Sequence, residues 1–108
     1  MLWILAAVLV LLAILLYASY RADIRAAYAH LDTLDRQIID TACGPIEVAI
    51  RGEGEPVLVS HGIGGGFDQG LGLAGAYLGN GYQVIAPSRF GYHGTPLPAD
   101  ASPTSQAD

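Results

Sequence analysis

The stretch that decides the fold is Val57-Leu58-Val59-Ser60-His61-Gly62-Ile63-Gly64-Gly65-Gly66, a short apolar run followed by a loop rich in glycine. Residues 57–60 are apolar enough for a strand buried on both faces, as in a parallel sheet. The pattern predicts a helix over residues 70–79 and a further strand over residues 83–86. Strand, glycine loop, helix and strand in this order predict a parallel βαβ unit of an α/β fold.

The residues before this unit predict a pair of strands. Residues 46–50 alternate in polarity and are rich in β-branched side chains, which is typical of a half-buried strand. Residues 38–42 are a candidate partner strand, with Gly44-Pro45 as the turn between them. Residues 52–56 form a second expected turn, because they combine glycines with a proline.

The helix of the βαβ unit has recognisable ends. Asp68 is a candidate N-cap, and Asn80-Gly81 is a typical stop signal. Interior glycines cost up to about 1 kcal/mol each in a helix, so we expect this helix to lie close to a sheet. Near the end of the sequence, Ser102-Pro103 predicts the start of another helix, with proline at its first position.

Residues 1–20 carry no charged side chain and form an apolar run long enough to cross a membrane. Trp3 near one end, and Tyr17 and Tyr20 near the other, are typical of membrane interfaces. A cleaved signal peptide is the alternative, but its apolar core is usually shorter and follows a basic residue. The sequence therefore predicts an uncleaved single-pass transmembrane anchor over residues 1–20.

Residues 21–37 are predicted to form a juxtamembrane amphipathic helix. The apolar residues recur at helical spacing as Ile24, Ala27, Leu31, Leu34 and Ile38. Such a stripe also suits a coiled-coil dimer, but two heptads are fewer than that structure usually needs. Because the basic residues follow the apolar run, the positive-inside rule places the C-terminal part on the cytoplasmic side.

Composition excludes several classes of protein. Hydrophobic residues make up 52 % of the 108 residues, charged residues 14 %, and the mean hydropathy is +0.39. Disorder would need a more polar chain, and a net charge of −5 argues against nucleic-acid binding. The single Cys43 rules out an internal disulfide or a cysteine zinc site, and no cofactor or metal is expected.

The loop over residues 61–66 resembles the oxyanion loop of the α/β-hydrolase fold family, in which His-Gly and further glycines follow a strand. Glycines allow backbone amides to point into a site that a substrate can approach closely. The resemblance implies that the amide of Ile63 donates to the oxyanion, with Gly64 as a neighbouring candidate. It implies a supporting role for the remaining loop residues, namely His61, Gly62, Gly65 and Gly66.

A second motif, residues 88–95, is similar to the family's Asp-Arg-Pro-Gly-x-Gly-x-Ser loop. Arg89 and Gly91 match it, whereas Ser88 stands in the place of the aspartate. The order and spacing of the two motifs carry the resemblance over roughly residues 40–108. The expected architecture is thus a transmembrane helix followed, over residues 38–108, by an incomplete α/β-hydrolase sheet.

The sequence contains no nucleophile elbow. None of its serines has glycine two residues before and two residues after it, as Gly-x-Ser-x-Gly requires. The acid and the late histidine of the family's triad are not identified either. We therefore interpret the chain as the N-terminal fragment of a membrane-anchored serine-type ester or acyl hydrolase, inactive by itself.

Two other functions fit part of the sequence. A glycine loop after a strand, with Ser88-Arg89 after the next strand, could belong to an NADP-binding Rossmann-type βαβ unit. The chain could also be a small non-enzymatic membrane protein. For the hydrolase, the expected partners are the lipid bilayer and, in the full-length protein, a small ester-like substrate. The sequence identifies neither that substrate nor the oligomeric state.

Overall fold

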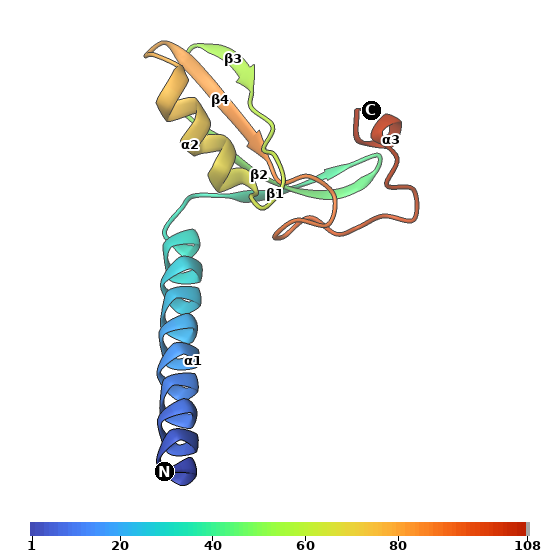
Figure 1. Cartoon of the computed structure of the whole chain (residues 1–108). Helices are drawn as coiled ribbons and strands as arrows, with labels where there is room; N and C mark the ends of the chain where they lie inside the picture. The colour runs from blue at the N-terminus through green and yellow to red at the C-terminus, as the bar shows by residue number, and fades with distance from the viewer. Residues whose placement is uncertain (108) are drawn as a thin grey trace. The chain divides into compact units, whose positions relative to one another are not determined.

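The computed structural model describes residues 1–107 and divides the chain into two compact units, Met1–Thr33 and a second unit that begins at Leu34. The first unit is one helix, α1. The second contains β1, β2, β3, α2, β4 and the short helix α3 (Pro103–Ala107) in chain order, which is a mixed α/β arrangement (Figure 1). The predicted fold class is confirmed.

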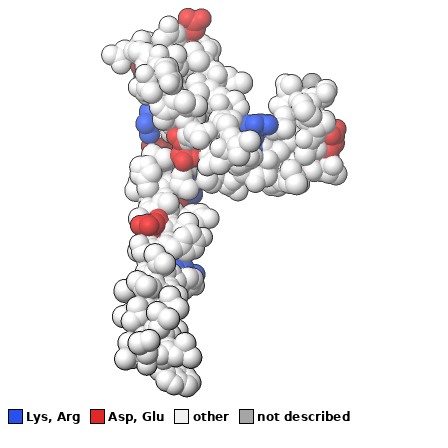
Figure 2. Space-filling model, in the orientation of Figure 1, with Lys and Arg blue, Asp and Glu red and all other residues white. Residues whose placement is uncertain are grey.

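Helix α1 runs over Leu2–Asp32, and its 31 residues extend about 46 Å. None of its residues is buried, and its most apolar window has a mean hydropathy of 2.7. The helix is long and apolar enough to cross a membrane by length and composition, and the face visible in Figure 2 lacks charge along its N-terminal half. A signal sequence would pass the same length and composition test.

The helix ends before the predicted boundary at residue 37. The hydroxyl of Thr33 donates to the carbonyl of His30 at 2.6 Å, and its N–H donates to the same oxygen at 3.0 Å. Ile38 continues the helical spacing of apolar residues, but it lies in β1 (Gln37–Thr41) and is paired with Glu47. Strand pairing therefore overrides the helical period after Asp32.

Four strands form one sheet in the order β1-β2-β4-β3. β1 pairs with β2 (Gly44–Arg51) and β2 with β4 (Tyr82–Pro87) in the antiparallel sense. β3 (Glu55–Leu58) pairs with β4 in parallel and has no neighbour on its other side within residues 1–107. The βαβ unit that the sequence predicts is confirmed, although β3 ends two residues earlier than expected.

The hairpin between β1 and β2 turns at residues 42–43 and not at Gly44-Pro45, which already belong to β2. Thr41 explains the shift, because its hydroxyl accepts the N–H of Cys43 at 3.2 Å and donates to the carbonyl of Gly44 at 2.7 Å. Gly44 takes a positive φ of 107°, a backbone angle that glycine adopts without strain.

Helix α2 (Phe67–Tyr77) covers one face of the sheet and lies along β4 (Figure 1). Its buried members Phe67, Leu71 and Ala74 pack with Ala49 and Ala86 to form most of the core. The N-cap is Gly66, so Asp68 lies inside the first turn and is not the cap that the sequence predicts. The helix also stops before Asn80-Gly81, because Leu78 is already extended.

The opposite face of the sheet is apolar and partly uncovered. Ala49 pairs with Ala86 on the α2 side, so their neighbours Ile50 and Ile85 point away from α2. Leu58 pairs with Ile85 and shares that face. Ile50 is 41 % exposed and Leu58 is 69 % exposed. This face therefore exposes apolar side chains from β2 and β3 within residues 1–107.

Gly70 is the helix glycine that the close approach to the sheet requires. A Cβ atom there would lie 2.8 Å from the carbonyl oxygen of Val59 and 3.0 Å from the Cβ of Ala86. A Cβ atom at Gly72 or Gly75 would have nothing within 4 Å, so the close approach of α2 to the sheet does not explain these two glycines.

This contrast predicts opposite effects of two alanine substitutions. Gly70→Ala should destabilise the second unit by roughly 1–3 kcal/mol, because the added methyl group forces α2 away from the sheet. Gly72→Ala should stabilise it by up to about 1 kcal/mol, because alanine is the better helix former. Urea unfolding of the full chain in detergent micelles, followed by the near-ultraviolet dichroism of its tyrosines, measures both changes. Equal effects of the two variants would contradict the close packing at Gly70.

Candidate functional site

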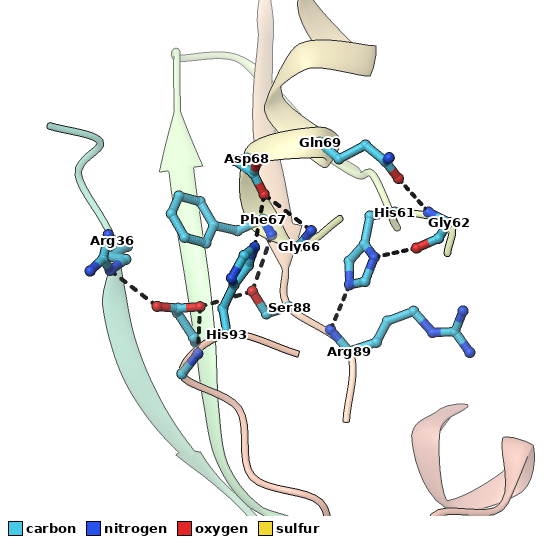
Figure 3. A network of polar contacts seen from close by, with 12 residues as sticks. Arg36, His61, Gly62, Gly66, Phe67, Asp68, Gln69, Ser88, Arg89 and His93 are labelled. Atoms are coloured by element: carbon cyan, nitrogen blue, oxygen red, sulfur yellow. Dashed lines mark hydrogen bonds and ion pairs between the residues drawn. The ribbon is translucent and has the colours of Figure 1, made fainter. Parts of the chain in front are cut away.

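The glycine loop, residues 61–66, connects β3 to α2 and lies beside the loop that follows β4. β3 and β4 are parallel, so both loops leave the same edge of the sheet. The loop after β4, residues 88–95, holds the second motif. The structure therefore brings together the two segments on which the resemblance to a known family rests (Figure 3).

His61 fastens the start of the glycine loop to the second loop. Its side chain is buried, and Nε2 accepts the backbone N–H of Arg89 at 2.9 Å. Nδ1 lies 2.7 Å from the carbonyl oxygen of Gly62. A backbone N–H can only donate, so these contacts assign the hydrogen of the neutral ring to Nδ1. The ring also meets Tyr92 edge-on, with the centroids 4.7 Å apart. This geometry suits a supporting role.

Gln69 fastens the middle of the glycine loop from the first turn of α2. Its Oε1 accepts the N–H of Gly62 at 2.7 Å, and its side chain fills the space that a Cβ atom at Gly65 would need. Sequence reasoning missed Gln69. A signal was available, because a long amide side chain directly after Gly-Gly-Gly-Phe-Asp can fold back onto the loop before it.

Several amides of the glycine loop have no partner. Within residues 1–107, the N–H groups of the consecutive residues Ile63, Gly64 and Gly65 donate to no other group of the protein. Gly64 has a positive φ of 83°, and the side chain of Ile63 is 93 % exposed. The two residues that the sequence proposes as oxyanion donors thus have amides available to a ligand.

The second loop is held by Ser88, Arg89 and Gly91 in different ways. Ser88 is buried, and its hydroxyl accepts the N–H of Phe67 at 3.1 Å. The side chain of Arg89 is tied by Nε to Oε1 of Gln106 at 3.2 Å. Gly91 has a positive φ of 79° and donates to the carbonyls of Thr95 and Pro96. All three serve the shape of the loop in this structure.

A buried carboxylate that sequence reasoning missed lies at the centre of these contacts. Glu47 in β2 is only 4 % exposed. Its Oε2 accepts the hydroxyl of Ser88 at 2.9 Å and the N–H of Gly94 at 3.0 Å. Its Oε1 lies 3.1 Å from Nε of Arg36. An acidic residue on the α2-facing side of β2, next to Ala49, was the available signal.

His93 and Asp68 form a second, more exposed pair at the N-terminus of α2, with His93 Nε2 3.1 Å from Asp68 Oδ1 (Figure 3). His93 has a positive φ of 45°, and its ring occupies the space that a Cβ atom at Gly66 would need. Burial, the largest single influence, raises the pKa of Asp68. The N–H of Gln69, the ring of His93 and the N–H of Gly66 together outweigh it, so the pKa falls below the ordinary value of 3.8.

Comparison with known proteins gives the family. No protein-family model and no curated protein matches the chain. A solved α/β hydrolase fold protein from Nakamurella multipartita is 42 % identical over 68 % of this chain, with a TM-score of 0.63. The chain belongs to the α/β-hydrolase fold family. An epoxide hydrolase from an endophytic Streptomyces also matches, with 30 % identity over 61 % of this chain and a TM-score of 0.48.

This α/β-hydrolase chain spans 25 % of the length of the Nakamurella protein and 20 % of that of the Streptomyces enzyme. The nucleophile elbow, which the family places on a strand-to-helix turn, has no counterpart among the serines of the sequence. Residues 1–107 form the glycine loop, the second loop and the contacts between them.

The lowered pKa of Asp68 predicts a pH-dependent contribution to stability. A carboxyl whose pKa is lower in the folded state stabilises that state above the ordinary pKa, and this contribution disappears as the pH falls through the folded value. At pH 7 Asp68→Asn should therefore cost about 0.5 kcal/mol, a small value because the pair is partly exposed. The cost should shrink as the pH falls through the lowered pKa of Asp68 in the folded state.

Urea unfolding of both proteins between pH 7 and pH 2.5 checks this. As a control, the same two proteins are compared with His93→Ala added to both. Without the imidazole ring, the difference in their free energies of unfolding at pH 7 should be smaller. A difference that grows as the pH falls would contradict the assignment.

Proposed function

We propose that this chain supplies the oxyanion side of a membrane-anchored serine-type hydrolase that acts on ester or acyl bonds. The observation that carries the proposal is the run of free amides that includes Ile63 and Gly64, in a loop that contacts of His61 and Gln69 hold in place. In ester hydrolysis, negative charge develops on the carbonyl oxygen in the tetrahedral transition state. Fixed N–H donors aimed at that oxygen stabilise it and need no rearrangement during the reaction.

The rigidity of the loop supports the same role. An oxyanion donor lowers a barrier only if it already points to the place where charge will form. Here His61 ties the start of the loop to Arg89, and Gln69 ties Gly62 to α2. On the other side of the free amides, Oδ1 of Asp68 accepts the N–H of Gly66 at 3.1 Å. The loop is thus fixed at both ends, and the exposed side chain of Ile63 leaves the surroundings of these amides open to a substrate.

The remaining catalytic groups would have to come from further polypeptide. The family's hydrolases use a serine, an acid and a late histidine in this order, and the second oxyanion amide follows the serine. The free edge of β3 and the uncovered apolar face around Leu58 and Ile50 support an additional strand and helices in the complete enzyme. By this proposal the 108-residue chain is inactive alone.

The anchor of this proposed hydrolase is α1. The uncharged residues 2–20 of α1 are about as long as the hydrocarbon core is thick, and the helix satisfies its own backbone hydrogen bonds, so this part is stable in a bilayer. Arg21 and Arg25 follow the apolar run, and the guanidinium of Arg21 lies 6.0 Å from the ring centroid of Tyr17. The positive-inside rule then places the second unit in the cytoplasm.

The oxyanion role predicts the result of a loop exchange. In a chimera, the matching segment of the Nakamurella protein is replaced by the second unit of this chain, which begins at Leu34. Hydrolysis is followed with nitrophenyl acyl esters of the chain length that the parent turns over best. Ile63→Pro removes the amide hydrogen and should lower kcat roughly 100- to 1,000-fold.

Ile63→Ala is the matched control, because it keeps the amide and changes only an exposed side chain. It should leave kcat within about threefold of the unsubstituted chimera, since the donor remains. Equal kcat values for the two variants, with folding verified by circular dichroism, would sink the proposed role of this amide. The 108-residue chain alone should release no nitrophenol above background.

The anchor predicts a membrane-extraction result. The intact chain, with Met1 retained in its mass spectrum, should stay in the membrane pellet after an alkaline carbonate wash. The double substitution Leu9→Arg and Leu12→Arg should release it, because each charge at the centre of a span costs roughly 2.5–3.5 kcal/mol. Ala29→Arg, beyond the apolar run, should not release it. A soluble product that lacks the first 20 or so residues would establish the signal-peptide alternative.

A further inference from the structure

We propose that Glu47 is a positioning residue, whose buried carboxylate orients Ser88 and thereby fixes the end of the glycine loop; its meaning for catalysis rests on the proposed function. The starting observation is that a carboxylate 4 % exposed receives three donors, two from the second loop and one from Arg36, which precedes β1. A buried charge is retained only where such partners compensate its lost hydration.

The chemistry of the donors requires a carboxylate at this position. The hydroxyl of Ser88, the N–H of Gly94 and Nε of Arg36 all direct hydrogens at Glu47. An ionised carboxylate accepts on both oxygens, whereas an amide would turn an NH₂ group against one set of donors. Arg36 supplies the opposite charge, and its guanidinium also lies 5.5 Å from the ring centroid of Phe67.

Glu47 also determines the direction of the next hydrogen bond. A serine hydroxyl has one hydrogen, and Ser88 gives it to Glu47. The lone pairs of Ser88 then accept the N–H of Phe67 at 3.1 Å. Phe67 directly follows Gly66, so this bond holds the end of the glycine loop (Figure 3).

The next residue of the second loop holds the other end. The N–H of Arg89 donates to His61 at the start of the glycine loop. Two consecutive residues, Ser88 and Arg89, therefore fix both ends of the segment that contains the free amides of Ile63 and Gly64. The main chain of Glu47 secures Ser88 in turn, because its carbonyl accepts the N–H of Ser88 at 2.8 Å.

The test is amide hydrogen exchange of the full chain in detergent micelles, resolved by residue with NMR. Glu47→Gln should speed exchange at both Phe67 and Gly94 by at least about tenfold, measured relative to the change at the amides of the sheet. Ser88→Ala should speed exchange at Phe67 and leave Gly94 protected, because Glu47 still accepts the Gly94 N–H. This difference between the variants is the signature of the proposed relay.

Val48→Ala is the control for lost stability. Val48 is buried next to Glu47 in β2 but points to the other face of the sheet. It should speed exchange across the sheet without singling out Phe67 and Gly94. If Glu47→Gln gives that same uniform pattern, or if Ser88→Ala leaves Phe67 as protected as in the parent, the proposal is wrong. Should Glu47→Gln not fold, the Ser88→Ala comparison decides alone.

The exchange experiment does not measure catalysis, so its outcome is separate from that of the chimera. A chimera without oxyanion stabilisation would overturn the proposed function and leave the exchange pattern of Glu47 intact. In an active chimera, Ser88→Ala should lower kcat more than it raises KM, because a loosened loop loses transition-state contacts before it loses substrate binding. A change confined to KM would argue against positioning.

Discussion

The parallel pairing of β3 with β4 is the constraint on which the site depends. Parallel neighbours end at the same edge of a sheet, so the loops that follow them have to share one region of space. The polar contacts then exploit this proximity, since Ser88 and Arg89 reach the two ends of the glycine loop. If β3 paired with another strand, Ser88 and Arg89 would not reach the glycine loop and could not hydrogen-bond to its ends.

The site combines satisfied and unsatisfied polar groups in a definite pattern. Buried groups such as Glu47, His61 and Ser88 all have partners, and no buried side-chain nitrogen or oxygen among residues 1–107 lacks one. The free donors of the glycine loop include the main-chain amides of Ile63 and Gly64, near the surface. Leaving these amides without a protein partner therefore costs little free energy of folding, because water can hydrogen-bond to them until a ligand replaces it.

The sequence was informative where structure is local. Apolar runs and glycine loops predicted the βαβ unit, and Ser102-Pro103 predicted the start of α3 (Pro103–Ala107), where the N–H of Ser105 donates to the hydroxyl of Ser102. Two of the errors came from contacts that local patterns do not contain. The period through Ile38 suggested more helix, but pairing with β2 took that residue. Glu47 meets Ser88 across 41 positions of the sequence, so no spacing rule could have identified it.

One side of β3 has no partner strand within residues 1–107, which leaves its backbone N–H and C=O groups open to pairing. An open strand edge offers hydrogen bonds to any extended segment, and it does not distinguish its proper neighbour from a second copy. Leu58 adds exposed apolar surface beside that edge. Chaperones and proteases act on chains that expose apolar surface and unpaired strand edges of this kind. Pairing of this edge with its proper neighbouring strand would then compete with degradation of the unpaired chain.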